Sequence, residues 1–131
     1  MIDLKEMAAR ILAELEEAGQ EHVPAMLNTV AATTGDAEEK TQYAAALAVL
    51  VRDDLARLAY DRDPQGWLVP LSKEESVAAV SQLADGLLFG TNDGLWTWVG
   101  SRRPDILITP AGLQQARELI EARGYSWWRT I

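Results

Sequence analysis

One helix-start signal recurs along this sequence and constrains the fold more than any other feature. It consists of Asp3 with Glu6, Asp36 with Glu39, and Ser72 with Glu75. In such a capping box the first side chain accepts a free backbone amide, while the glutamate bonds back to the cap residue. Apolar residues at helical spacing follow the first box at positions 4, 7, 8, 11, 12 and 15. The sequence therefore predicts helices that begin next to residues 3, 36 and 72.

Proline and glycine mark two further helices and several helix ends. Pro24 and Pro110 suit the first turn of a helix, where the missing N–H has no partner in any case. Gly19 and Gly124 follow apolar stripes and can adopt the left-handed conformation that ends a helix. We therefore expect helices over residues 4–18, 24–32, 37–54, 73–83 and 110–123.

The segments between the later helices have the composition of short strands. Residues 55–60 and 67–71 flank a loop rich in Asp, Pro and Gly, and residues 87–89 and 95–99 flank Asn92-Asp93-Gly94. Such pairs predict β-hairpins. Residues 106–108 and 125–131 are predicted as further strands. The predicted fold class is α+β and mostly helical, with a helical N-terminal half, two short hairpins and a C-terminal helix.

This order of elements resembles the winged helix-turn-helix superfamily. Met26 to Gly35 is similar to the first helix of the motif, Gly35-Asp36 to its turn, Glu38 to Asp54 to its recognition helix, and Leu55 to Leu71 to its wing. In the second half, Leu83 to Leu88 and Ile108 to Gly112 are similar to the steps into and out of a wing. We expect a single compact domain over residues 1–131. Two small winged helices in tandem, over 1–71 and 72–131, remain an alternative.

The resemblance implies a recognition helix in the major groove of DNA, but the charge of that segment is unfavourable. The 131 residues have a net charge of −8, and residues 1–71 hold 6 basic against 13 acidic side chains. Asp36, Glu38 and Glu39 surround Lys40 at the start of the recognition helix, and Gln42 is its one base-reading side chain before an apolar run. Since phosphate neutralisation supplies most non-specific affinity for DNA, this helix is a poor DNA-binding surface.

Two partner hypotheses follow. We favour a non-enzymatic protein-binding or regulatory module, with an acidic N-terminal face that suits a basic partner and a C-terminal tryptophan–arginine surface. A DNA-mimicking inhibitor is a minor version of this hypothesis. Its candidate binding residues are Trp96, Trp98, Trp127, Trp128, Asp36, Glu38 and Glu39. The alternative is a DNA-binding transcription regulator, with candidate DNA contacts at Lys40, Gln42, Arg102, Arg103 and Arg117. Both hypotheses are compatible with a homodimer.

The tryptophans lie wholly in the second part of the chain. All 5 follow residue 66, and Trp and Arg are enriched in the binding hot spots of protein interfaces. A role in the core is the competing interpretation: Trp67, Trp96 and Trp98 are then expected to pack between sheet and helices. Because neighbouring strand side chains point to opposite faces, one of Trp127 and Trp128 is expected to be exposed.

The sequence offers little for catalysis. His22 is the single histidine, and its place at a helix entry predicts a capping role. No catalytic triad spacing, phosphate loop, dinucleotide fingerprint or metal-binding histidine pair is present, and there is no cysteine. We expect no enzyme activity, no cofactor and no metal. The absence of an apolar run of membrane-spanning length and of an N-terminal targeting pattern predicts a cytoplasmic protein without a membrane partner.

Overall fold

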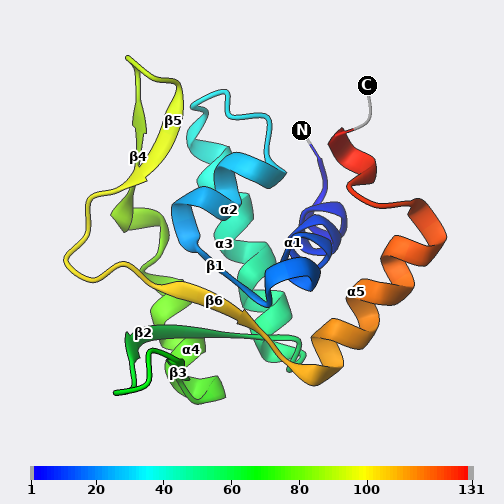
Figure 1. The fold of residues 1–131 in the computed structure, drawn as a ribbon. Helices are drawn as coiled ribbons and strands as arrows, with labels where there is room; N and C mark the ends of the chain where they lie inside the picture. Colours follow the sequence, from blue (N-terminus) through cyan, green and yellow to red (C-terminus); the bar gives the residue numbers. More distant parts are fainter. Residues whose placement is uncertain (1, 130–131) are drawn as a thin grey trace.

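The computed structural model describes residues 2–129 and has an α+β fold that is mostly helical (Figure 1). The helices are α1 (Leu4–Ala18), α2 (Val23–Val30), α3 (Ala37–Arg52), α4 (Lys73–Ser81) and α5 (Pro110–Arg123), with short 3-10 turns η1 (Ala84–Gly86) and η2 (Trp127–Arg129). The strands are β1 (Gln20–His22), β2 (Ala56–Arg62), β3 (Leu68–Pro70), β4 (Leu87–Gly90), β5 (Leu95–Trp98) and β6 (Asp105–Ile108). The predicted fold class is confirmed.

The expected helices form, but their caps differ in detail. Ser72 and Glu75 make the complete reciprocal capping box at α4. At α1 and α3 only the aspartate half is present, because Asp3 accepts from the amide of Glu6 and Asp36 from that of Glu38. The glutamates of those two boxes bind other groups, described below. Gly19 ends α1 with a φ of 79°, a conformation that glycine adopts without steric cost.

The main sheet combines strands from both halves of the chain. Its order is β1-β6-β2-β3, and β6 lies antiparallel between β1 and β2. The short strand β1 is absent from the sequence prediction, because three residues are too few to show a period. Since β2 and β6 are neighbours, residues 63–104 form an insertion between two paired strands. That insertion contains β3, α4 and the separate β4–β5 hairpin.

The core lies between α1, α2, α3 and the inner face of this sheet. Ile11, Leu15, Leu27 and Leu47 are completely buried there. Tyr43 is also fully buried, and its hydroxyl donates to the carbonyl oxygen of Val23 at 2.8 Å. Burial raises the pKa of the Tyr43 phenol well above its ordinary value. The phenol therefore acts as a fixed hydrogen-bond donor that ties α3 to the start of α2.

The β4–β5 hairpin is anchored on the helices by side chains from α2 and α3. The side-chain amide of Asn28 donates to the carbonyl oxygen of Trp96, and its oxygen accepts the Trp96 amide, at 2.9 and 2.8 Å. The Lys40 ammonium donates to the carbonyl oxygen of Leu87 at 3.1 Å. Trp96 is 3% exposed and packs edge-on against Phe89. The inserted hairpin therefore belongs to the same hydrophobic core.

Two sequence predictions about the tryptophans are wrong. Of the strand predicted over residues 125–131, residues 125–126 form a turn and 127–129 the 3-10 turn η2, because the chain lies along α1 and finds no strand partner among residues 2–129; residues 130–131 lie outside the described residues. Trp67 does not pack between sheet and helices: it is 69% exposed. The carboxylate of Asp63 accepts the Trp67 amide at 3.0 Å, so the tight hairpin turn directs this side chain to solvent.

Candidate functional site

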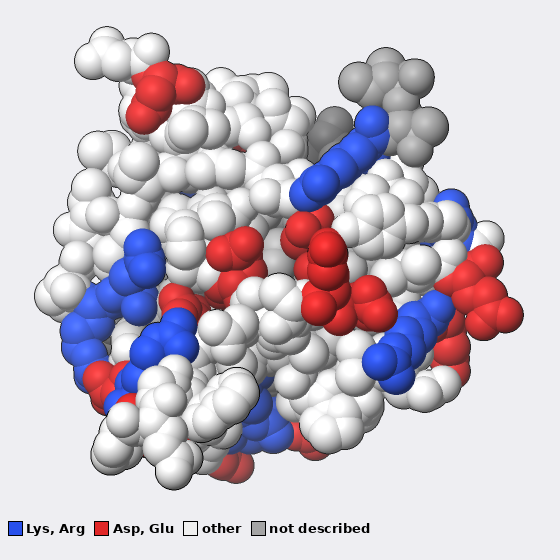
Figure 2. Space-filling view, viewed as in Figure 1, with Lys and Arg blue, Asp and Glu red and all other residues white. Residues whose placement is uncertain are grey.

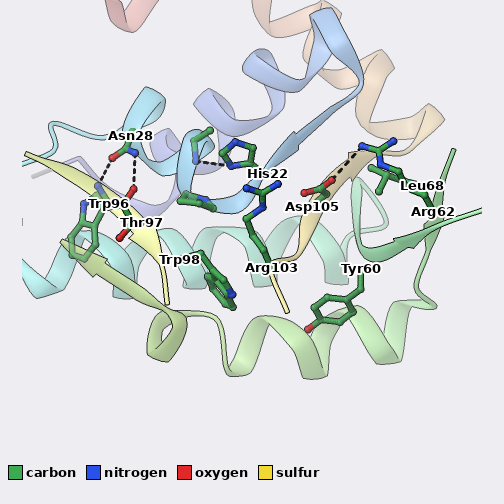
Figure 3. A pocket seen from close by; sticks show the side chains of 12 residues that line it. His22, Asn28, Tyr60, Arg62, Leu68, Trp96, Thr97, Trp98, Arg103 and Asp105 are labelled. Carbon is green, nitrogen blue, oxygen red and sulfur yellow. Dashed lines mark hydrogen bonds and ion pairs between the residues drawn. The ribbon is translucent and has the colours of Figure 1, made fainter. Parts of the chain in front are cut away.

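An open groove lies between the two hairpins, at the entry to α2 (Figure 3). We call it the interhairpin groove. Its volume is about 760 Å³, within the range of ligand-binding pockets. The side chains that line it come from α2, β1, both hairpins and the start of β6. They are His22, Pro24, Ala25, Asn28, Tyr60, Arg62, Leu68, Trp96, Thr97, Trp98, Arg103 and Asp105.

Arg103 is the charged group of the groove that makes no ion pair or hydrogen bond with its side chain among residues 2–129. It lies in the loop between β5 and β6, and Figure 3 shows its side chain reaching into the groove beside His22 and Trp98. Among residues 2–129 no carboxylate lies within 4.0 Å of its guanidinium group, and no acceptor bonds to it. The loop positions Arg103 because the next residue, Pro104, is buried and its carbonyl accepts the amide of Val23 at 3.2 Å.

The aromatic wall of the groove is held by close packing against glycines. The Trp98 ring lies against Gly86 and Gly100, where an added Cβ would overlap ring atoms. Its indole Nε1 is buried and has no acceptor within the described residues, and the same is true of Trp96 Nε1. Tyr60 lies on the opposite side, on β2, with the Arg102 guanidinium 4.3 Å from its ring centre. Both indole N–H groups are therefore enclosed within the wall and are not exposed to the groove.

His22 has the capping role that the sequence predicts. Its Nδ1 accepts the amide of Ala25 at 3.3 Å at the first turn of α2. Because an accepting Nδ1 places the proton of the neutral ring on Nε2, the remaining donor of His22 is Nε2, which lies 3.9 Å from a carboxylate oxygen of Glu21. The one carboxylate in the groove wall belongs to Asp105, which lies 3.8 Å from the guanidinium of Arg62. Arg103 is therefore the cation of the groove wall that no carboxylate neutralises among residues 2–129.

Elsewhere, most of the basic side chains are already paired with acids. All twelve Lys and Arg residues lie in the described part of the chain, and eight of them make ion pairs. These eight are Arg10, Arg57, Arg62, Lys73, Arg102, Arg117, Arg123 and Arg129. Figure 2 shows acidic side chains in the middle of one face, with basic ones on one side over α5 and on the other over β2 and the loop before β6.

A connected cationic ridge is therefore not present on α3 and its neighbours. Lys40 is bonded to the β4 backbone, and Arg57 is paired with Asp54. Arg102 Nη2 donates to both carboxylate oxygens of Asp61, at 2.8 and 2.9 Å. Arg52 is exposed at the far end of α3, about 18 Å along the helix from Lys40 at 1.5 Å per residue.

The solvent-facing side of α3 presents few groups that could read DNA bases. Its exposed residues are Ala37, Glu38, Thr41, Ala45 and Arg52. The Gln42 side chain, a predicted base reader, donates to the backbone carbonyl of Ile2 instead. Of the predicted DNA contacts, Lys40, Gln42, Arg102 and Arg117 all have intramolecular partners, and Arg103 alone is without one in the described part of the chain.

Two predicted protein-binding residues of the N-terminal face are accessible and one is not. Asp36 and Glu38 are exposed at the start of α3. Glu39 is only 6% exposed, and its carboxylate accepts the amides of Thr34 and Gly35 at 2.8 and 3.0 Å. The prediction of Glu39 as a binding residue is wrong, because its charge stabilises the turn between α2 and α3.

The acidic face of α1 is covered in part by the basic C-terminal segment. Arg123 and Arg129 lie 2.7 Å from carboxylate oxygens of Glu6 and Glu14, and Arg117 lies 3.8 Å from Glu16. Burial by itself raises the pKa of Glu6, but the bonds from Trp127, Arg10 and Arg123 outweigh it and hold that pKa below its ordinary value. Part of the acidic N-terminal half is thus neutralised by arginines of the C-terminal half within the same fold.

The predicted aromatic residues separate into two places. Trp96 and Trp98 meet in the groove wall, although Trp96 is buried and offers no accessible side chain. Trp127 and Trp128 lie together on α1 and α2, both half-buried, with ring centres 4.8 Å apart. Their indole groups donate to Glu6 and to the carbonyl oxygen of Thr29. Neither ring is fully exposed, so that expectation is wrong.

Sequence reasoning missed Asn28 and Tyr60. Asn28 forms the bridge that fixes the second hairpin, and Tyr60 forms part of the groove wall. An isolated Asn on an amphipathic helix has no local signal for a partner 68 positions away. Asn28 also lies outside the apolar stripe of α2, which is formed by Val23, Met26, Leu27 and Val30.

Comparisons with protein-family models, with curated proteins and with solved structures gave no match for this chain. In the part of the chain that the structure describes, no helix combines the length and the apolar character needed to cross a bilayer.

Proposed function

We propose that this chain is a non-enzymatic protein-binding module with a regulatory role, and that its partner binds in the interhairpin groove. We further propose that its scaffold is a winged helix in which the wing contains an inserted helix and hairpin, residues 63–104. The helices α1 to α3, followed by the antiparallel pair β2 and β6, support this interpretation.

The observation that supports the proposal most is the convergence of Arg103 and Trp98 in one open groove. Both come from the segment that the sequence singles out as a tryptophan–arginine surface. Arginine and tryptophan are the residue types that most often dominate the energy of protein interfaces. Exposed apolar side chains outside the groove lining also lie on both hairpins or directly after the second one. They are Trp67, Val69, Leu88, Leu95 and Val99.

The DNA-binding hypothesis is the competing function. Phosphate contacts from several Lys and Arg side chains supply most of the non-specific affinity of such proteins. Arg102 and Arg117 would have to give up their pairs with Asp61 and Glu16 to make those contacts. Arg103 and Arg52 are the exposed arginines without such a pair among residues 2–129, and two separate charges neutralise little phosphate.

Site-specific crosslinking tests the proposal. A photoreactive side chain placed at Thr97, which is exposed and lines the groove, is expected to trap a defined protein partner in cells. The same group placed at Ala45 on the exposed face of α3 serves as the control. The purified partner is then expected to bind the wild-type chain in calorimetry. Crosslinking to nucleic acid from Ala45, with no protein trapped from Thr97, would favour the transcription regulator instead.

A further inference from the structure

The hydrogen-bonding groups that line the groove indicate the class of ligand that it binds. Its exposed donor is the Arg103 guanidinium, which has no partner among residues 2–129. The indole N–H groups of Trp96 and Trp98, by contrast, are buried within the wall, and His22 Nε2 lies 3.9 Å from a carboxylate oxygen of Glu21. Both polar atoms of the Asn28 side chain are used by Trp96. Arg62 lies beside Asp105, the one carboxylate of the wall. A ligand in this groove must therefore bring acceptors.

The charge of the donors narrows the ligand further. Arg103 is cationic, exposed and unpaired among the described residues, in a chain whose net charge is −8 and whose other cations are mostly paired. A carboxylate accepts two parallel bonds from a guanidinium group, and such charge-assisted pairs are stronger than neutral hydrogen bonds. Charge complementarity thus favours a carboxylate next to Arg103.

The remaining walls of the groove are apolar or aromatic. Pro24, Leu68, Trp98 and Tyr60 line the groove together with Arg103 (Figure 3). An open groove with apolar walls and a cation that is unpaired among the described residues suits a peptide segment that has both a charged and an apolar side chain. Apolar side chains beside the carboxylate would contact these walls.

We propose that the interhairpin groove binds a short acidic peptide segment of a partner protein, with an Asp or Glu carboxylate paired to Arg103 and apolar side chains against Trp98 and Leu68. This inference rests on the proposed function and specifies the chemical class of the partner segment that the groove binds. It differs from the sequence-based expectation of a basic partner for the acidic N-terminal face, because the groove presents the Arg103 cation.

Selection from a library of short random peptides tests the inference without a known partner. The full chain is the bait, and Arg103→Glu is the counter-selection bait. Peptides retained by the wild type and lost with Arg103→Glu are expected to be enriched in Asp and Glu next to apolar residues. Arg103 is exposed, so its substitution leaves the core intact, which circular dichroism checks.

The best selected peptide is then measured by fluorescence anisotropy against matched variants. Arg103→Ala is expected to weaken binding about tenfold or more, the size of a charge-assisted hydrogen bond. Arg52→Ala removes another exposed, unpaired arginine outside the groove and is expected to leave the affinity unchanged. A version of the peptide with Asn and Gln in place of its acids is expected to lose binding.

The possible failures can be told apart. Groove-dependent peptides without acidic residues, or no enriched peptides at all, would overturn the acidic-ligand inference while leaving the crosslinking test of the proposed function open to succeed. Binding of random-sequence duplex DNA that depends on Arg103 would overturn both. Equal losses from Arg103→Ala and Arg52→Ala would show a general charge effect and would also overturn the inference.

Discussion

Asn28 holds the second hairpin against α2, so its removal has a calculable effect. The Asn28→Ala variant loses two hydrogen bonds to the backbone of Trp96, at 2.8 and 2.9 Å. Each such bond contributes about 1 kcal/mol, and the partners left unpaired beside a buried ring add to the loss. We expect the free energy of unfolding to fall by about 2 to 3 kcal/mol. The melting temperature should drop by about 10 °C for a domain of this length.

Two further variants make this prediction specific. Asn28→Asp keeps an oxygen that accepts the Trp96 amide but replaces the donor to the Trp96 carbonyl, so an intermediate loss is expected. Asn92→Ala changes an exposed Asn in the hairpin turn and is expected to cost less than about 0.5 kcal/mol. Urea unfolding followed by circular dichroism measures all three variants. If Asn28→Ala were as stable as Asn92→Ala, the bridge would contribute nothing and the reasoning would be refuted.

Three other predictions concern the scaffold. Glu39→Ala removes a buried carboxylate that accepts two turn amides; we expect a loss of about 2 kcal/mol in urea unfolding, and a change under about 0.5 kcal/mol would contradict it. Gly112→Ala places a Cβ onto the carbonyl oxygen of Leu55, so α5 must shift at a cost of about 2 kcal/mol, whereas a rise in melting temperature would show that the contact relaxes freely. The lowered pKa of Glu6 means that the folded state favours its carboxylate. This contribution is complete above the ordinary pKa of 4.5 and is lost as the pH falls through the lowered value. Acid unfolding should therefore become less steep in Glu6→Gln, and an unchanged profile would contradict the assignment.

The helices could be predicted from the sequence because their signals are local. Capping residues, Pro24 and the helical apolar stripes place the start of each α-helix within about two residues of its position in the structure. Both hairpins follow from turn residues between apolar runs, Asp63-Pro64-Gln65-Gly66 in the first and Asn92-Asp93-Gly94 in the second. The cap formed by His22 is predictable for the same reason, because it lies directly before the first turn of α2 and accepts an amide three residues away.

The sheet order and the site could not be predicted, because they depend on contacts between distant residues. Nothing in residues 105–108 indicates that they pair with both β1 and β2. Whether a charged side chain is paired also depends on residues that are distant in the sequence. Glu6 and Arg123 are separated by 117 positions yet form a close ion pair. Net charge counted along the sequence therefore indicated an exposed acidic face, part of which is engaged in the fold.

The five indole N–H signals of the tryptophans offer the most direct test of where a partner binds. In a nitrogen-15 NMR titration with the selected acidic peptide, we expect the signals of Trp96 and Trp98 to move and those of Trp127 and Trp128 to stay in place, because only the first pair lines the interhairpin groove. Movement of the Trp127 and Trp128 signals alone would place the ligand on the C-terminal segment and contradict the groove as the binding site.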